Sequence, residues 1–235
     1  MKPIIKGILF DKDGTLLDYH LSWGPLNARV ALYAARGDQD LADRILAANG
    51  FDKKAGKVVS GSLLAAGSTH EIASGFIAAG STYELAELIV AIDEIFRSGV
   101  ATVVAVTDLG AFFRRIKKRG LAIGIASSDS EKAIHLTADR FGFAKDVDFI
   151  AGWDSGYGTK PSRGMLDAFA AHSRLEPRHI VVVGDNLHDM EMAAAGGAGL
   201  RVGVLTGTSS RSELQEACDL CLDSIRDLEA ALFDT

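Results

Sequence analysis

The pattern of hydrophobic and polar positions divides the chain into three parts. Residues 4–10 form a short apolar run that predicts a buried strand and ends in an acidic turn. From about residue 21 to residue 105 the chain is rich in alanine, and its apolar residues recur at helical spacing. Strand-like and helix-like segments then alternate as far as residue 204. This pattern predicts an α/β protein in which a helical segment is inserted after the first strand.

Within the insertion, apolar periodicity predicts four helices, at residues 26–36, 39–48, 70–79 and 82–97. Ser81 precedes Glu84 by three residues, which is the spacing of a capping box, and would begin the last of these helices.

The alternating part predicts helices at 109–118, 131–141, 162–173 and 188–195, and strands at 121–126, 147–150, 180–183 and 200–204. Strands separated by helices of this length indicate right-handed crossovers and a parallel sheet. The run Gly196-Gly197-Ala198-Gly199 follows a helix and lacks a third glycine at the offset of a dinucleotide-binding loop, so it predicts a helix stop.

Polar residues gather at the predicted strand ends, where parallel sheets bind their ligands. There are four such groups: Asp11 with Asp13, Ser127-Ser128-Asp129, Lys160 in its glycine-flanked loop, and Gly184-Asp185-Asn186. Pro161, next to Lys160, is suited to the first turn of the following helix. We therefore expect all four groups to meet at one edge of the sheet.

The acidic turn places two carboxylates on one side of the chain, because residues two apart in an extended strand point the same way. A calcium-binding EF-hand loop counted from Asp11 would need a glycine and a glutamate where the chain has Leu16 and Ser22. A purely structural turn would leave the other three polar groups unexplained. The pair therefore indicates chemistry at the strand end.

Four stretches resemble the ordered motifs of the haloacid dehalogenase superfamily: Asp11-Lys12-Asp13-Gly14-Thr15, the serine at the next core strand end, Lys160-Pro161, and Gly184-Asp185-Asn186-Leu187-His188-Asp189. Ser127-Ser128 departs from the Thr-Asn or Ser-Asn of many members. The inserted helices resemble the cap of the subgroup that includes phosphoglycolate phosphatase and β-phosphoglucomutase. The resemblance implies a Rossmann-like, doubly wound parallel sheet core of residues 1–18 and 106–235, and an all-helical cap of residues 19–105.

The residue types suit hydrolysis of a phosphate monoester. Asp11 would attack the phosphorus and form an aspartyl-phosphate, while Asp13 protonates the departing oxygen and later takes a proton from water. A like-charged neighbour favours one of the two acids remaining protonated, as an acid catalyst requires.

Magnesium is the expected cofactor, because it prefers carboxylate and water oxygens. It would be held by Asp11, Asp185 and the backbone carbonyl of Asp13, with Asp189 binding a metal-bound water or orienting Lys160. The candidate phosphate-binding residues are Gly14, Thr15, Ser127, Ser128 and Lys160. Of these, Lys160 and Ser127 would also assist catalysis, by supplying positive charge and hydrogen bonds to the phosphoryl oxygens.

Charge, hydropathy and cysteine content limit the partners and the location that we expect for this protein. The 235 residues carry a net charge of -6, which argues against a nucleic-acid surface. No apolar run is long enough to span a bilayer and the start lacks a signal-peptide layout, so we expect a cytoplasmic protein without membrane contact. Cys218 and Cys221 have the spacing of a redox or zinc motif, but there is no second ligand pair, which favours a structural role.

The sequence thus predicts a magnesium-dependent phosphatase for a small phosphorylated metabolite, phosphoglycolate-like by resemblance, acting as a monomer or homodimer. Asp13 argues against ion pumps and dehalogenases of the superfamily, which lack this acid. Two alternatives stay open: a phosphomutase, and a catalytically quiet phosphate-binding module. The insertion would select the substrate, with His20 and five polar cap residues as candidate contacts: Ser60, Ser62, Ser68, Thr69 and His70.

Overall fold

The structure, a computed structural model, describes residues 4–99 and 101–234. The chain forms two compact units, one made of Met1–Asp18 with Ala105–Thr235 and the other of Tyr19–Val104. Each unit has its own hydrophobic core, and the two are described separately below.

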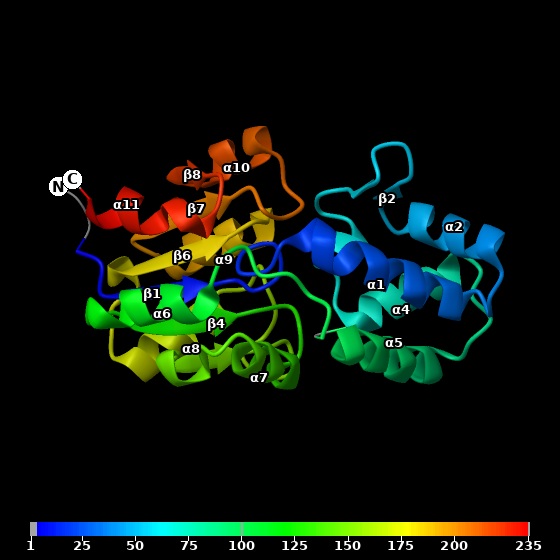
Figure 1. The fold of residues 1–235 in the computed structure, drawn as a ribbon, viewed down its shortest axis with the longest axis horizontal. Coiled ribbons are helices and arrows are strands. Elements are labelled where there is room, and N and C mark those ends of the chain that lie inside the picture. Colours follow the sequence, from blue (N-terminus) through cyan, green and yellow to red (C-terminus); the bar gives the residue numbers. More distant parts are fainter. Residues whose placement is uncertain (1–3, 100, 235) are drawn as a thin grey trace. The chain divides into compact units, whose positions relative to one another are not determined.

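The first unit is built on a six-stranded parallel sheet in the order β5-β4-β1-β6-β7-β8 (Figure 1). Its strands are β1 (Gly7–Phe10), β4 (Ala122–Ala126), β5 (Phe149–Ala151), β6 (Ile180–Gly184), β7 (Leu200–Val204) and β8 (Leu220–Leu222). β1 lies inside the sheet, and Phe10 at its end pairs with Ile125 on one side and Val183 on the other. The carboxyl ends of these three strands therefore lie level with one another.

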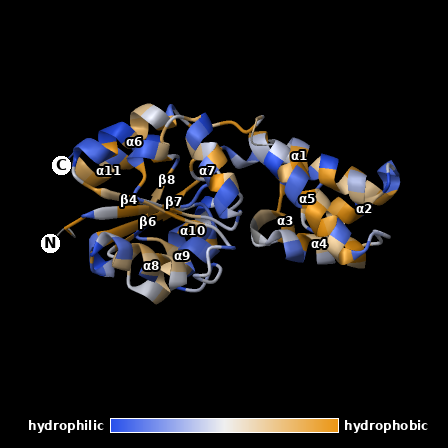
Figure 2. Cartoon of the chain, turned by 90° about the horizontal axis from the view of Figure 1, so that it is seen from below, coloured by the Kyte–Doolittle hydropathy of each residue, from blue (hydrophilic) through white to orange (hydrophobic). Residues whose placement is uncertain are grey.

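Helices cover both faces of this sheet, with α6 and α11 on one side and α8 and α9 on the other (Figure 2). The helices are α6 (Leu109–Lys118), α7 (Glu131–Arg140), α8 (Gly164–Ser173), α9 (Leu187–Gly196), α10 (Arg211–Ala217) and α11 (Leu228–Phe233). Three short 3-10 helices join them: η1 (Ala144–Asp146), η2 (Pro177–His179) and η3 (Ile225–Asp227). Phe10 packs edge-on against Phe112 and Phe113, whereas Leu9 belongs to the opposite core with Phe169. The predicted doubly wound α/β core is confirmed.

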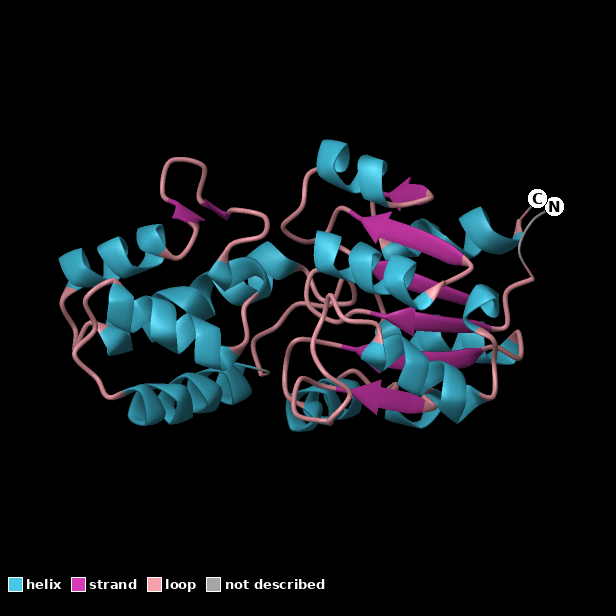
Figure 3. Ribbon diagram, turned by 180° about the vertical axis from the view of Figure 1, so that it is seen from behind, coloured by secondary structure: helices cyan, strands magenta, loops and turns pink. Residues whose placement is uncertain are grey.

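The second unit contains the helices α1 (Tyr19–Ala34), α2 (Gln39–Ala48), α3 (Leu63–Ala66), α4 (Thr69–Ala78) and α5 (Leu85–Gly99). Val30, Ile45, Phe76 and Ile92 are fully buried in its core. The expectation of an all-helical insertion needs a correction, because two short antiparallel strands, β2 (Phe51–Asp52) and β3 (Lys57–Val58), form a hairpin (Figure 3). Its turn includes Gly56, whose φ of 64° suits a tight reversal.

Three helix starts differ from the prediction by two residues or more. α1 begins at Tyr19 rather than residue 26, and the helix continues through Pro25. α5 begins at Leu85 because the Ser81 hydroxyl donates to the carbonyl of Ala34 at 2.8 Å instead of capping a helix. α8 begins at Gly164, so Pro161 lies in the preceding turn and outside the helix.

The predicted helix stop agrees with the structure. Gly197 ends α9 with a φ of 73°, as a helix stop requires. The cysteines are free thiols, and Cys221 lies in β8 at the edge of the sheet. Among the residues described, no helix is both long enough and apolar enough to cross a bilayer.

Candidate active site

The candidate site lies at the carboxyl ends of β1, β4 and β6. Asp11, Ser127 and Asp185 each follow one of these strands directly. Lys160 reaches the same place from the loop before α8, and Asp189 comes from the first turn of α9. The register of the sheet thus brings together residues that are far apart in the sequence.

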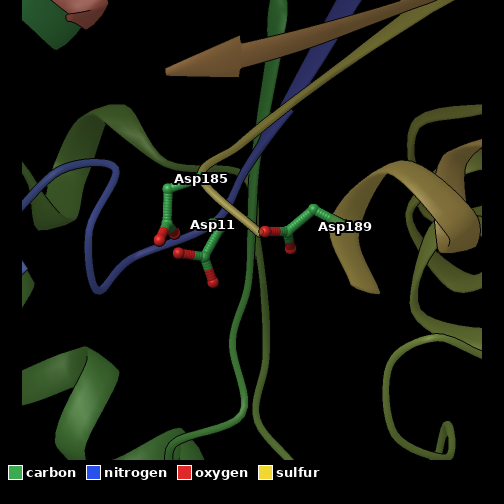
Figure 4. Close-up of side chains that lie close together, drawn as sticks. All are labelled: Asp11, Asp185 and Asp189. Carbon is green, nitrogen blue, oxygen red and sulfur yellow. The ribbon is translucent and has the colours of Figure 1, made fainter. Parts of the chain in front are cut away.

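Three aspartates form a compact acidic cluster (Figure 4). Asp11, Asp185 and Asp189 each offer a carboxylate oxygen, and these oxygens all lie within 4.8 Å of one another. All three residues are buried. Burial raises the pKa of Asp185 well above its usual range, and the negative charges of Asp11 and Asp189 add to this effect. The cluster therefore holds more negative charge than its buried position favours.

Lys160 partly compensates this charge. Its Nζ lies 2.6 Å from Oδ1 of Asp11 and 2.6 Å from Oδ1 of Asp189. Burial disfavours the ammonium, but the two carboxylates outweigh it and raise the pKa of Lys160. Burial likewise raises the pKa of Asp11, against the opposing effect of Lys160. Oδ2 of Asp11 is buried and has no hydrogen-bond partner among the described residues.

These residues fit a divalent metal ion. A hard cation such as Mg²⁺ prefers carboxylate oxygens, and one lysine cannot balance three aspartates. The buried Oδ2 of Asp11 has no hydrogen-bond partner among the described residues, so the cluster keeps an oxygen that its own side chains do not satisfy. Asp189 has a second role, because its Oδ2 accepts a hydrogen bond from the Asn186 amide at 3.2 Å and so caps α9. The side chain of Asp13 lies outside this three-aspartate cluster.

Asp185 is enclosed by backbone from two loops. Gly14 has a φ of 89°, and a Cβ there would lie 2.5 Å from the Asp185 carboxylate. The hydroxyl of Thr15, a residue expected to bind phosphate, is directed to Oδ1 of Asp185 at 3.5 Å. The Thr208 amide donates to Oδ2 at 3.0 Å, and a Cβ on Gly207 would lie 1.6 Å from that same oxygen. Only glycines leave room for this carboxylate.

The loop after β7 is a part of the site that the sequence did not reveal. Besides the contacts of Gly207 and Thr208 with Asp185, the Thr206 hydroxyl donates to the carbonyl of Gly14 at 2.6 Å. The rule that ligands gather at strand ends could have pointed to this Thr-Gly-Thr turn, because the preceding strand was predicted.

Asp13 forms its own ion pair beside the acidic cluster. Its Oδ2 lies 2.5 Å from Nζ of Lys12, and that nitrogen lies 3.1 Å from Oδ2 of Asp129. Burial raises the pKa of Asp13 to about 6, although the charge of Lys12 opposes the shift. Burial disfavours the charge of Lys12, but Asp13 and Asp129 outweigh it and raise its pKa.

Lys12 received no role from the sequence, yet its side chain lies against the Asp13 carboxylate. The backbone bends at Lys12, whose carbonyl accepts hydrogen bonds from the amides of Leu16 at 2.9 Å and Leu17 at 3.0 Å. The bend ends the alternation, so Lys12 turns back toward Asp13.

Ser127 and Ser128 lie in the site at the carboxyl end of β4. Ser127 is buried, its amide donates to the carbonyl of Ala151 at 2.9 Å, and its hydroxyl accepts from the Asp129 amide at 3.1 Å. Ser128 is half-buried next to it. Ser127 is therefore fixed at the strand end, as a phosphate-binding group needs to be.

Three aspartates and a buried lysine thus meet at the strand ends of a parallel α/β sheet, as the four motifs predicted. A family model described as haloacid dehalogenase-like hydrolase matches residues 5–197. The chain belongs to this family, which confirms the resemblance found in the motifs.

Sequence relatives and solved structures agree with this assignment. D-glycero-β-D-manno-heptose-1,7-bisphosphate 7-phosphatase of Salmonella typhi is 37% identical over 73 residues, which are 31% of this chain and 39% of that protein. A candidate β-phosphoglucomutase from Thermotoga maritima has a TM-score of 0.70 at 18% identity, over 98% of this chain and 100% of the other. A predicted phosphoglycolate phosphatase from Haemophilus somnus also gives 0.70, at 17% identity, over 97% of each chain. The two solved structures share the fold of the whole chain.

Proposed function

We propose that this protein is a magnesium-dependent phosphatase that hydrolyses the phosphate monoester of a small metabolite through an aspartyl-phosphate on Asp11. The observation that carries the proposal is the state of Asp11. One of its carboxylate oxygens is bound by Lys160, whereas the other is buried and has no hydrogen-bond partner among the described residues. A carboxylate held in this way has one oxygen directed and one oxygen available for attack.

In the first half-reaction, Oδ2 of Asp11 forms a bond to phosphorus while the bond between phosphorus and the ester oxygen breaks. Asp13 gives its proton to that oxygen, so the alcohol leaves neutral. Asp13 suits this role because burial raises its pKa to about 6 and part of its population stays protonated near neutral pH. Lys160 offsets the charge of the approaching phosphate, and Ser127 donates a hydrogen bond to it.

In the second half-reaction, water attacks the phosphorus and the bond to Asp11 breaks. Asp13, now a carboxylate, accepts the proton of that water, which regenerates both residues and releases inorganic phosphate. One acid thus serves both steps, and proton and electron counts balance over the cycle.

Asp11 and Asp185 would hold Mg²⁺, with Asp189 beside them. When bound, the ion neutralises charge on the phosphoryl oxygens and on the acidic cluster. The Thr208 amide and the two glycines around Asp185 keep its carboxylate directed into the cluster.

Phosphoglycolate-like metabolites are the first substrates to test. The phosphatase names of the Salmonella relative and the Haemophilus structure support ester hydrolysis, and neither fixes the leaving group for this chain.

The test is release of inorganic phosphate from a panel of small phosphate monoesters, with Mg²⁺ and with a chelator. Asp11→Asn provides the blank, and Asp139→Asn, an exposed aspartate on α7, is the matched control. Magnesium-dependent release that is lost only in Asp11→Asn supports the proposal. If sugar phosphates are isomerised without phosphate release, the protein is a mutase, and if no ester reacts, the phosphatase proposal is wrong.

A further inference from the structure

Lys12 is the buried charge of the site that the proposed phosphatase mechanism does not use. Its side chain is 3% exposed and ends between the carboxylates of Asp13 and Asp129. Burying an ammonium group costs free energy unless the group is closely paired. The charged side chain of Lys12 is therefore stable here only while both Asp13 and Asp129 pair with it.

Asp129 is itself fixed from three directions. Its Oδ1 accepts from the Ser130 amide at 2.7 Å, its carbonyl accepts from the Trp153 amide at 3.1 Å, and its own amide donates to Ser127 Oγ at 3.1 Å. These bonds leave Oδ2 directed at Lys12. Asp129 is therefore a rigid anchor next to the phosphate-binding serine.

A chain of contacts follows from this arrangement. Ser127 contacts Asp129, Asp129 binds Lys12, and Lys12 binds Asp13. The chain joins the loop after β4 to the loop after β1, and thereby relates the position of Asp13 to the place where the phosphate would be held. The Lys12 ammonium contacts Asp13 and Asp129, so we expect its effect on the reaction to act through Asp13.

We propose that Lys12, anchored by Asp129, is a positioning residue that aims the Asp13 carboxyl at the departing ester oxygen. The inference rests on the proposed function and deepens it, because it assigns the correct placement of the proton donor to two residues outside the acidic cluster. The inference predicts that the effect of removing Lys12 depends on the leaving group. An alkoxide needs the proton, whereas a nitrophenolate is stable enough to depart without one.

The experiment compares kcat/KM for an alkyl phosphate and for p-nitrophenyl phosphate in the same preparation of each variant. Lys12→Met keeps the length of the side chain and removes its charge. We expect the alkyl ester to lose about 10²-fold and the nitrophenyl ester less than tenfold, since only the former depends on proton donation. The ratio of the two values does not depend on the fraction of folded enzyme.

Two further variants complete the test. Asp129→Asn removes the charged anchor and should lower the same ratio, and it serves alone if Lys12→Met fails to fold. Lys132→Met, an exposed lysine on α7, is the matched control and should leave the ratio unchanged.

An equal loss on both esters, or no loss, in Lys12→Met and Asp129→Asn would overturn the inference. That result leaves the proposed function standing, because the unmodified protein would still hydrolyse the esters. If the unmodified protein hydrolyses neither ester, the proposed function fails first, and the inference fails with it.

Discussion

Two buried lysines serve this site, and each lies between two aspartates, yet their surroundings differ. Lys160 contacts Asp11 and Asp189 beside the additional carboxylate of Asp185. Lys12 contacts Asp13 and Asp129. The first group, the Lys160 cluster, contains one ammonium group and three carboxyl groups. The second, the Lys12 cluster, contains one ammonium group and two carboxyl groups, and its net charge becomes zero when Asp13 is protonated.

The difference separates two tasks that share similar residues. The Lys160 cluster keeps an excess of negative charge and an unpartnered oxygen on Asp11, which suits a divalent cation and an attacking carboxylate. The Lys12 cluster can balance its charge with a proton alone, which suits an acid and base. In the proposed mechanism, the ratio of lysine to aspartate therefore decides whether a cluster suits metal binding or proton transfer.

The largest effect should follow from removing the proton donor of the Lys12 cluster. Asp13→Asn keeps the shape of the side chain but cannot donate the proton, and we expect kcat on an alkyl phosphate to fall by about 10²–10⁴-fold. Phosphate release under saturating substrate and Mg²⁺ measures it. Mg²⁺ affinity through the side chains of the Lys160 cluster should change little, and a variant as active as the unmodified protein would contradict the assignment.

Removing the lysine of the Lys160 cluster should lower activity somewhat less, but by the same factor for every ester. Lys160→Met takes positive charge from the phosphoryl group, so kcat/KM should fall by about 10²–10³-fold for both alkyl and nitrophenyl esters. The unchanged ratio between the two esters is the contrast with Lys12→Met. A leaving-group dependence in Lys160→Met would show that the two clusters do not divide the work in this way.

A smaller effect is expected from crowding Asp185, the proposed metal ligand. A Cβ on Gly207 would lie 1.6 Å from Oδ2 of Asp185, so Gly207→Ala must turn this carboxylate. The Mg²⁺ concentration for half-maximal activity should rise by about 10–100-fold, and Mn²⁺ binding measured by calorimetry should weaken in parallel. Gly24→Ala has open space for its methyl group and should leave both values unchanged.

The last effect concerns stability and pH, and is the smallest in activity. Burial raises the pKa of Asp11, Asp13 and Asp185 in the folded protein, so the fold binds protons more tightly than the unfolded chain does. For Asp13 this stabilisation is present below about pH 4 and is lost as the pH rises through about 6. Its loss is worth at most about 3 kcal/mol.

Melting temperatures in the presence of a chelator measure how stability changes with pH. Tm should fall by on the order of 5 °C between these pH values, and less so in Asp13→Asn. Saturating Mg²⁺ should reduce the fall, because the cation replaces protons at the Lys160 cluster. A Tm that rises over this pH range in the unmodified protein, with the same slope in Asp13→Asn, would contradict the pKa shifts.

The core of the fold was predictable because its signals are local. The segments at 109–118 and 200–204 coincide with α6 and β7, since their periodicity needs no distant partner to be recognised. Prediction failed where a contact with a distant residue determines the local structure. Ser81 has the sequence of a cap, yet its hydroxyl binds the carbonyl of Ala34, which is 47 residues away.

The same limit applies to the site. Asp11, Lys160 and Asp185 could be placed at one edge because each belongs to a segment next to a predicted strand or helix. Lys12 escaped notice because a bend, not an extended strand, sets its direction. Asp129 was noticed among the polar strand ends but received no role, since its partner Lys12 is 117 residues earlier in the chain. Their roles as catalytic, metal and phosphate-binding groups stay predictions.

The interior position of β1 has a consequence for synthesis. Gly7 pairs with Ala122 and with Ile180, so β1, the strand that precedes Asp11, is made before either of its partners. At about 5–20 residues per second, a ribosome needs roughly 10–35 s to produce the second partner. The insertion of 19–104 has its own hydrophobic core and can collapse during that interval. Until residue 122 is made, a nascent chain therefore carries an unpaired apolar strand, and we expect its folding yield to depend on chaperones that cover such strands.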